Sequence, residues 1–550
     1  MVAGLGRKAY YAARYPRRTV RETSKLRDLV RFRARSSPML RSARPWGDAS
    51  ATVLIVSLSE FVYQLKLEGI LGKAFQLAGC RVVALTHSLD RWGEPYLGAF
   101  GIDEFVHPED FLDDAAEQEV ERAVAEVLAG DLGVQSLRLV EFHGAHVGEQ
   151  TLSTISRRFE QGRISLSDPP LRAALEEVLR ESMASVLAGE RLLERLDPDV
   201  VLFNEKNYAG FGSIYDLALA RGANVIQFVI AGIHWRDALV FKRFTEETRR
   251  VHPTSLSRES WERVSTLPWT DERERELRDE FELRYGGGEM HPDAGMQAGK
   301  RIKTAEEVRA QLGLDPAKKT IVVFSHVLWD ANMFFGADLF EDQETWLVET
   351  VRAACANDAV NWVVKLHPAN MYKTDARELN DEIAIREAVG DLPSHVKLLR
   401  PETDINTYSL FAVTDGGVTI RGTIGMELPV FGIPVLTAGT GRYSGLGFTV
   451  DSETAAEYLD RLAHAQELEP LDEEAVLLAK RHAYALFRLR PFRFTSYRAS
   501  FMPPARLSHP LSHNLELTLR TPGEVEQAPD LRAFAAWALG SEADYLAEPA

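Results

Sequence analysis

The sequence predicts an α/β protein with two Rossmann-like domains that face each other across a cleft. Two series of short apolar strands alternate with helices, the first over residues 50–250 and the second over 319–465. Strands that are apolar throughout and separated by helices are typical of parallel sheets covered on both faces. At 550 residues the chain also exceeds what one hydrophobic core normally supports. Two domains of similar size are therefore expected.

The first series begins with a β-branched strand at residues 52–58, a helix at 64–79 and a second strand at 81–86. This order forms one βαβ unit, with Gly79 ending the helix. Further helices are expected at 115–130, 170–195 and 214–221, and further strands at 199–203 and 224–230.

The second series follows a charged stretch with helical character at 257–284 and 303–312. Strands are expected at 320–325, 361–367, 396–399, 418–420 and 433–437, with helices at 343–357 and 423–431. Five segments follow: a basic N-terminal arm (1–49), an acceptor domain (50–250), an inter-domain crossover (251–318), a nucleotide-sugar-binding domain (319–465) and a C-terminal helical extension with crossover helices (466–550).

The composition is that of a globular enzyme, with 45% hydrophobic and 26% charged residues. No apolar run approaches the roughly 18 residues of a membrane span, and the N-terminus lacks the apolar core of a signal peptide. The two cysteines, Cys80 and Cys355, have no metal-ligand spacing and fit a reducing compartment. A cytoplasmic location is expected.

Positive charge is concentrated in residues 1–45, which hold 13 Lys or Arg against Glu22 and Asp28. The whole chain carries −17, so with +11 in this segment the remainder carries −28. An acidic body argues against nucleic acid as a partner. The basic segment is interleaved with aromatic and aliphatic residues, which suits the anionic inner face of a membrane. A solvated or self-docked helix is the alternative.

The sharpest motif is residues 363–368 (VVKLHP). Side chains alternate along a strand, so Lys365 and His367 face the same way. Pro368 ends the strand because it has no N–H to donate. Two cationic or donor groups thus project from a strand's carboxyl end, where open α/β sheets bind ligands. The motif predicts a phosphate site.

A second motif, residues 416–427, runs from a strand through Arg421, Gly422 and Thr423 into a helix. Small residues let the backbone approach a phosphate, and a helix N-terminus offers free N–H groups. Thr423 either caps the helix or donates to phosphate, and Glu427 is placed to accept from ribose hydroxyls. A glycine-rich turn used only for packing is the alternative. A further glycine-rich loop at 439–448, which contains Tyr443, faces the same rim.

Together these motifs resemble the capsule polysaccharide biosynthesis family, which includes the bacterial Kdo transferases of capsule export. The resemblance covers residues 318–450, and extends weakly to 143–148 and 324–330. It implies the two-domain GT-B fold, donor phosphate contacts for Lys365, His367 and Thr423, and a ribose contact for Glu427. Gly422-Thr423 replaces the family's usual Ser-Thr, and the loop at Tyr443 also departs from the Kdo enzymes. Kdo is therefore not assigned as the sugar.

Candidates for the general base lie in the first domain and at the start of the second. Glu205 follows the strand at 199–203 and His234 follows the strand at 224–230, so both lie at carboxyl ends of strands. Asp330 follows the first strand of the second domain. His143 and His146 are further candidates. For each, a structural polar residue is the alternative.

The predicted function is a glycosyltransferase that moves a sugar from a nucleotide-activated donor to a lipid-linked or oligosaccharide acceptor of bacterial surface polysaccharide. No cofactor or metal is expected, because lysine, histidine and a helix dipole can neutralise the leaving phosphate. Peripheral attachment to the inner face of the cell membrane is expected through residues 1–45. Three alternatives remain open: a polyol-phosphate transferase of teichoic-acid type, a nucleotide-sugar 2-epimerase, and an inactive assembly factor.

Overall fold

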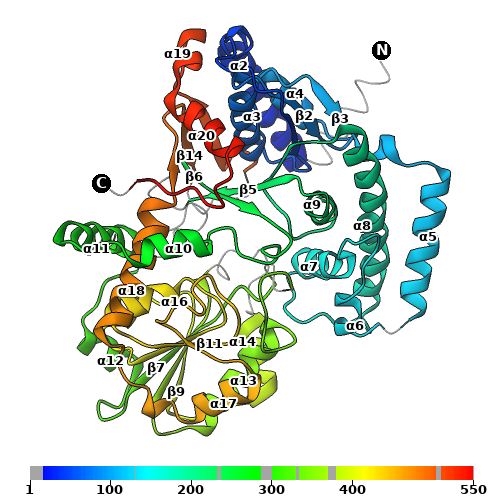
Figure 1. The fold of residues 1–550 in the computed structure, drawn as a ribbon. Coiled ribbons are helices and arrows are strands. Elements are labelled where there is room, and N and C mark those ends of the chain that lie inside the picture. Colours follow the sequence, from blue (N-terminus) through cyan, green and yellow to red (C-terminus); the bar gives the residue numbers. More distant parts are fainter. Residues whose placement is uncertain are drawn as a thin grey trace.

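A computed structural model describes residues 16–130, 132–231, 237–286, 300–329, 333–368, 380–502 and 509–548. Two α/β halves are stacked, each built around its own sheet, and the C-terminal segment returns to the half in which the chain began (Figure 1). The predicted fold class, two Rossmann-like domains, is confirmed.

The first sheet has seven strands in the order β13-β6-β5-β4-β1-β2-β3. The strands from β5 to β3 are parallel, whereas β6 and β13 are antiparallel additions at one edge. The predicted sheet lacked these two strands and also β3, at the other edge. The strands are β1 (Thr52–Val56), β2 (Arg81–Leu85), β3 (Glu104–Val106), β4 (Val200–Phe203), β5 (Asn224–Ile230), β6 (Ala238–Phe244) and β13 (Phe492–Arg493).

Helices cover both faces of this sheet, because alternate side chains of each strand enter different cores. Val53 and Ile55 of β1 belong to one core, and Leu54 and Val56 to the other. The first core lies under α2 (Pro16–Ser42), α3 (Val62–Leu77), α4 (Gly93–Ala99) and α20 (Pro529–Leu539). The second lies under α5 (Asp114–Ala129), α6 (Val134–Arg138), α7 (Val147–Phe159), α8 (Pro169–Leu196) and α9 (Phe211–Ala220).

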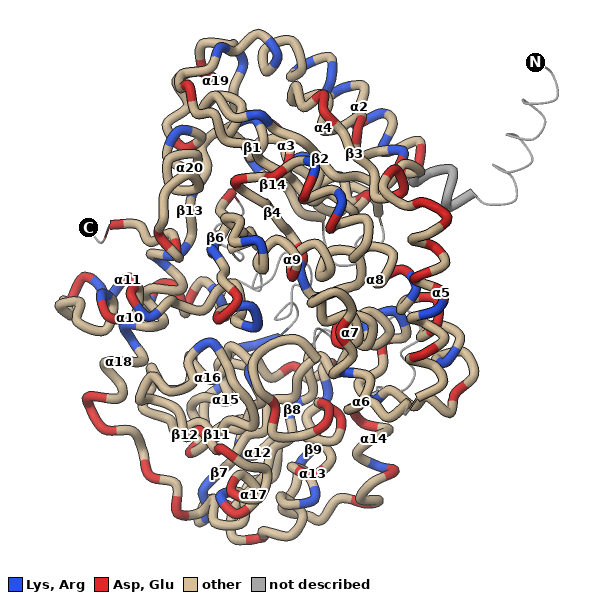
Figure 2. The backbone as a smooth tube through the Cα atoms, turned by 45° about the vertical axis from the view of Figure 1, so that its right-hand side comes forward, with Lys and Arg blue, Asp and Glu red and all other residues tan. Residues whose placement is uncertain are grey.

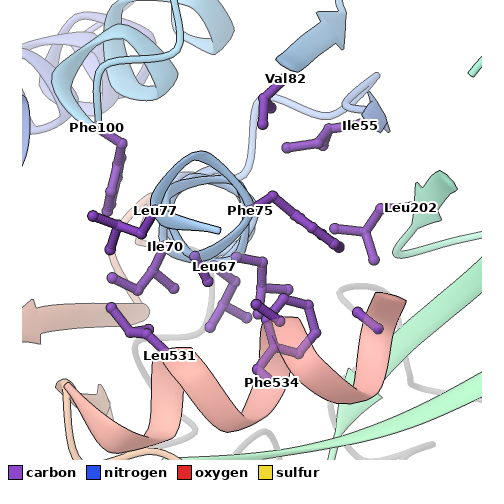
Figure 3. Packing of buried hydrophobic residues seen from close by; sticks show 14 of the residues in the cluster. Ile55, Leu67, Ile70, Phe75, Leu77, Val82, Phe100, Leu202, Leu531 and Phe534 are labelled. Atoms are coloured by element: carbon purple, nitrogen blue, oxygen red, sulfur yellow. The ribbon is translucent and has the colours of Figure 1, made fainter. Parts of the chain in front are cut away.

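Helix α3 is the centre of the first core and is buried along almost its whole length. Phe75 points from α3 towards Leu202 of the sheet, and Leu531 and Phe534 of α20 lie along the neighbouring side of α3 (Figure 3). Phe75 and Phe534 pack edge to face at 5.3 Å between ring centroids. A helix near the C-terminus thus completes the core of the N-terminal half.

The second sheet has six strands in the order β12-β11-β10-β7-β8-β9, and every pair in it is parallel. The order reverses between β7 and β10, which is where doubly wound folds bind ligands. The strands are β7 (Thr320–Phe324), β8 (Asn361–Lys365), β9 (Val396–Leu399), β10 (Gly416–Thr419), β11 (Val435–Thr437) and β12 (Val450–Asp451).

Helices also cover both faces of the second sheet. One core involves α13 (Gln343–Ala356), α14 (Asn380–Val389) and α17 (Ala455–Ala463). The other involves α10 (Arg258–Ser265), α11 (Asp271–Gly286), α12 (Ala305–Leu312), α15 (Thr407–Phe411), α16 (Ile424–Glu427) and α18 (Glu473–Tyr484). The crossover segment therefore packs against the second domain.

The C-terminal extension, predicted as helical, is only partly so. After α18 and a π-helical turn (Ala485–Leu489), the chain adds β13 to the first sheet and then forms an antiparallel hairpin of β14 (Tyr497–Phe501) and β15 (His513–Leu517). Helices α19 (Pro522–Gln527) and α20 follow. Residues after 490 thus belong to the N-terminal half, and α18 is the predicted crossover helix (Figure 1).

Helix α2 is docked on the N-terminal domain along one side. Leu29, Phe32 and Leu40 are buried, and Asp28 forms an ion pair with buried Lys66 at 2.8 Å. Basic residues recur along α2 (Figure 2), and the arginines at 27, 31, 33, 35 and 41 are exposed. In the described part of the chain, no helix combines the length and apolarity needed to span a bilayer.

One loop of the second domain, residues 333–338, is held by both halves. Met333 and Phe334 are buried in the second core of the N-terminal domain. Arg138 donates to the carbonyl oxygen of Met333 at 2.8 Å, and Arg250 donates to that of Phe334 at 3.0 Å. This loop therefore joins the two domains.

Candidate functional site

A cavity of about 210 Å³ lies where the strand order of the second sheet reverses. We call it the strand-end pocket. Its lining follows three neighbouring strands: Ser325 and His326 after β7, Lys365 and His367 at the end of β8, and Thr419, Gly422 and Thr423 at and after the end of β10. Pro368 and Glu427 also line it. The two sequence motifs therefore meet at one place, as predicted.

Lys365 and His367 lie on the same side of the chain, with Leu366 buried in the core on the other. Lys365 is only 6% exposed, and none of the described residues forms a hydrogen bond or ion pair with its ammonium group. Burial, reinforced by the nearby charge of Lys300, lowers the pKa of Lys365 to about 7. A buried amine of this kind is suited to gaining a proton when an anion binds.

His367 is positioned by its backbone, since its N–H donates to Ser325 Oγ at 2.8 Å. Strand β8 ends at Lys365, two residues earlier than predicted. The His367 ring lies 6.3 Å from that of His326, between centroids. Two imidazoles thus border the pocket beside the lysine.

The helix expected at 423–431 is shorter than predicted. Helix α16 is one turn long and continues as a 3₁₀ turn over Leu428–Phe431. Pro429 explains the change, because it has no N–H for an α-helical hydrogen bond. Thr423 does not cap the turn with its side chain. The helix dipole at this turn is therefore weaker than the sequence indicated, whereas Thr423 still lines the pocket.

Glu427 is buried at the wall of the strand-end pocket and is held by the crossover helix α11. It accepts a hydrogen bond from the Tyr285 hydroxyl and another from Arg284 Nη2 at 3.1 Å. The Tyr285 ring stacks on Tyr408 at 5.5 Å. A carboxylate so held retains lone pairs for a ribose hydroxyl, but it also joins α11 to the second domain.

Tyr443, predicted to bind the donor, lies behind the pocket and does not line it. It is fully buried, and its hydroxyl donates to the carbonyl oxygen of Gly422 at 2.9 Å. A Cβ atom on Gly425 would lie 2.1 Å from the Tyr443 ring, so only glycine fits there. Tyr443 is therefore placed to position the Gly422 turn.

We expect Tyr443→Phe to lower the free energy of unfolding by about 1 kcal/mol, because one buried hydrogen bond is lost. It should also weaken ligand binding in the strand-end pocket, because the Gly422 turn loses its support. Urea unfolding and ligand titration would measure the two effects. Tyr458→Phe is the matched control, since that buried hydroxyl bonds to Trp346 and Thr350 elsewhere in the domain. Equal loss of binding in both variants would contradict the prediction.

Arg421 also lies outside the strand-end pocket. It lines a second cavity of about 290 Å³ between the domains, which we call the interdomain pocket. Arg421 donates to the carbonyl oxygen of Phe335 and forms an ion pair with Asp338. His326 and Arg442 line both cavities, so the two pockets are adjacent.

The general-base candidates are less well placed. Glu205 follows β4 as predicted and is half-buried, but it lines neither pocket. His234 and Asp330 lie outside the described residues. His143 forms ion pairs with Glu119 and Glu190, and His146 with Asp216 and Glu141. His143 and His146 thus have structural partners.

Sequence reasoning missed several residues that line the two pockets: Arg250, His252, His326, Tyr285 and Arg442. His326 could have been predicted as a site residue, because it directly follows a predicted strand. Arg442 lay in the glycine-rich loop that was singled out. No pattern pointed to Arg250, His252 or Tyr285, because they lie in or at the start of the charged crossover region.

Among the described residues, no group of three or more His, Cys, Asp or Glu side chains is arranged to hold a metal ion. Metal independence and the absence of a cofactor stay predictions.

Comparison with known families gives one match, over residues 294–477, to the family described as capsule polysaccharide biosynthesis protein. This segment contains both motifs on which the resemblance was based, so the predicted resemblance is confirmed. No curated protein matches the chain.

Solved structures match at low identity and low TM-score. The β-Kdo 2,4-transferase of Thermosulfurimonas dismutans KpsC is 13% identical, with 60% of this chain and 87% of that chain covered and a TM-score of 0.32. The β-Kdo 2,7-transferase of the same protein is 16% identical, with 54% and 79% covered and a TM-score of 0.29. UDP-GlcNAc 2-epimerase from Neisseria meningitidis is 12% identical, with 78% and 97% covered and a TM-score of 0.24. The fold assignment therefore rests on the strand orders given above.

Proposed function

Since residues 294–477 match the capsule polysaccharide biosynthesis family, we propose that this chain is a glycosyltransferase that uses a nucleotide-activated sugar. Its acceptor would be a growing, lipid-linked surface polysaccharide. The observation that carries the proposal is the convergence of Lys365, His367 and the Gly422–Thr423 turn on the strand-end pocket. A nearly buried lysine that forms no ion pair with the described residues, beside hydroxyl and imidazole groups, suits the phosphate of a nucleotide sugar.

In the proposed reaction, the acceptor hydroxyl attacks the anomeric carbon of the donor sugar. The bond between that carbon and the phosphate oxygen breaks, and its electron pair leaves with the phosphate. Lys365 would neutralise the new charge, while Glu427 would hold the ribose. The acceptor's proton passes to a general base, for which Glu205, His234 and Asp330 remain the candidates.

A panel of UDP-, GDP-, CMP- and CDP-linked sugars, tested by thermal shift, identifies the donor class, because a ligand of the native state raises the unfolding temperature. We expect one nucleotide class to stabilise the wild type and not His367→Ala. His464→Ala, an exposed histidine outside both pockets, is the control. No stabilisation by any nucleotide would count against the proposal.

Product analysis then separates the alternatives. Release of free nucleotide upon sugar transfer supports a transferase, an interconverted sugar still linked to nucleotide supports an epimerase, and transfer of a polyol phosphate supports the teichoic-acid-type reaction. Activity that survives EDTA would agree with metal-independent chemistry. Nucleotide binding without turnover would favour an assembly factor.

We also propose that α2 places the protein on an anionic membrane surface. Its exposed side combines Leu26 and Val30, 53% and 61% exposed, with exposed arginines that include Arg27, Arg31, Arg33 and Arg35. Apolar side chains between arginines suit the headgroup region of a bilayer. The docked opposite side of α2 would hold the domain at that surface.

We expect the protein to bind phosphatidylserine-rich vesicles and to bind neutral phosphatidylcholine vesicles weakly. The double variant Arg27→Glu/Arg31→Glu should lose at least about tenfold in affinity, because each basic residue near such a surface contributes about 1 kcal/mol. Vesicle sedimentation measures this. Arg258→Glu, on exposed α10, should bind as the wild type does. Equal binding to both vesicle types would contradict membrane attachment through these charges.

A further inference from the structure

The interdomain pocket has a lining drawn from both domains. Arg250 and His252 come from the segment after β6 of the first sheet. Arg421, Thr440 and Arg442 come from the loops after β10 and β11 of the second. Phe335 and Gly336 belong to the loop that both domains hold. The cavity therefore exists only when the two halves are together.

The described residues that line this pocket include three arginines and two histidines, but no Asp or Glu. The nearest carboxylates are already engaged. Asp338 pairs with Arg421, and Glu149 pairs with Arg249 at 2.8 Å and with Arg250 at 3.1 Å. Positive charge is thus in excess at the wall of the cavity.

Arg442 is less well compensated, since the charge of Glu427 acts on it without an ion pair. None of the described residues forms an ion pair with its guanidinium group, and its Nε is buried without a hydrogen-bond partner. Burial lowers the pKa of Arg442 below its ordinary value. Arg421 also keeps a buried Nε with no hydrogen-bond partner. Unmet guanidinium donors in a desolvated place are costly unless an anion binds there.

His252 adds a neutral donor to the same wall. The backbone N–H of Thr254 donates to His252 Nδ1 at 3.2 Å, so the proton of the neutral ring lies on Nε2. Burial, and then the charges of Arg442, Lys206 and Arg421, hold the pKa of His252 well below its ordinary value. A neutral imidazole with Nε2–H donates a hydrogen bond and cannot act there as a general base.

The pocket's chemistry is therefore that of an oxyanion receptor. Planar guanidinium groups bind carboxylates and phosphates through paired hydrogen bonds. His326 and Arg442 also line the strand-end pocket, so a donor phosphate bound there would lie next to this cavity.

We propose that the interdomain pocket binds a carboxylate or phosphate group carried by the sugars of the reaction, on either the transferred sugar or the acceptor saccharide. This inference rests on the proposed function for the identity of the ligand as a sugar. The interdomain pocket would make the enzyme selective for acidic saccharides. The selectivity would come from residues of both domains.

The test compares matched acidic and neutral ligands by titration. The first arm represents an acidic acceptor. It compares glucuronate and glucose 6-phosphate with glucose, each with and without UDP or CMP. The second arm represents an acidic donor. It compares UDP-glucuronate with UDP-glucose. We expect the acidic member to bind at least about tenfold more tightly in one arm, and that arm identifies the source of the anion.

Arg250→Gln and His252→Phe should remove this preference, whereas Arg258→Gln should keep it, because Arg258 is exposed and does not line the pocket. The wild-type comparison is decisive even if neither pocket variant folds. Equal binding of acidic and neutral ligands in both arms would overturn the inference, and so would a preference that survives in folded Arg250→Gln and His252→Phe. A preference for acids without any nucleotide binding would instead support this pocket and refute the proposed donor.

Discussion

Lys365→Met is expected to abolish nucleotide binding while making the free protein more stable. Affinity should fall at least about 100-fold, because the buried amine of Lys365 becomes a charged phosphate donor when the nucleotide binds. The free energy of unfolding should rise by about 2 kcal/mol, because the folded state no longer contains a desolvated amine. Nucleotide titration and urea unfolding measure the two effects. Opposite signs in binding and stability are typical of a binding residue.

Lys397→Met on β9 is the control, since Lys397 lines neither pocket. It should leave both nucleotide affinity and stability nearly unchanged. If Lys365→Met destabilised the free protein and left nucleotide affinity intact, Lys365 would be a structural residue and the phosphate site would lie elsewhere.

The pH dependence follows from the same lysine. Its pKa is about 7 in the free protein, and a bound phosphate would raise it. Nucleotide affinity should therefore fall about tenfold between about pH 6 and about pH 8, since binding then requires uptake of a proton. Lys365→Arg, which keeps its charge over this range, should flatten the profile.

The stability of the free wild type should change in the opposite direction. Between the folded pKa of about 7 and the ordinary lysine pKa near 10.4, the unfolded chain binds more protons than the folded one. The free energy of unfolding should therefore rise as pH rises through that window, because the cost of burying Lys365 falls. This part of the pH dependence should be absent in Lys365→Met.

Asp544→Ala is expected to cause the largest loss of stability, about 3–5 kcal/mol, because it leaves two buried cations without their counter-charge. Asp544 Oδ1 lies 2.8 Å from Lys242 Nζ and 3.0 Å from Arg490 Nη1, and all three side chains are buried. Asp544 Oδ2 accepts the Ser257 N–H at 2.5 Å. The carboxylate thus ties β6, the C-terminal return and the segment after the interdomain-pocket residues together. Calorimetry or urea unfolding measures the loss.

Glu542→Ala is the matched control, because Glu542 is exposed two residues away. It should change stability by less than about 0.5 kcal/mol. Burial alone would raise the pKa of Asp544, but Arg490 and Lys242 lower it below its ordinary value. Its contribution is therefore present above the unfolded carboxyl pKa near 3.9 and is lost as pH falls below it. A wild-type-like unfolding curve for Asp544→Ala would show that the cluster is not stabilising.

Local sequence pattern predicted both sheets well. Strands β5 and β9 match the predicted ranges, and β1, β2, β7 and β8 differ by one or two residues at an end. These strands are buried on both faces, so their apolar runs are continuous and easy to recognise. Strand β6 was missed because Lys242 and Arg243 interrupt its apolar pattern, and their partners lie near the C-terminus.

The part of the candidate site that lies on a strand was also predictable from local pattern. Alternation along β8 was enough to place Lys365 and His367 on one side, and the strand order brought them to the turn after β10. Tyr443 and Arg421 were assigned to the wrong surface, because a loop's direction depends on what it packs against. Tyr443 is buried against Gly425, and Arg421 turns towards Asp338.

The sequence by itself determined the two strand series, the polar groups at the strand ends and the basic character of the first helix, because these depend on neighbouring residues alone. The tertiary structure decided that Arg250 and His252 meet Arg421 and Arg442, that Glu427 is held by Tyr285, and that the last 60 or so residues complete the first domain. These contacts join residues more than 100 positions apart. The charge balance and burial that they create shift the pKa values of the site, and no local pattern encodes either quantity.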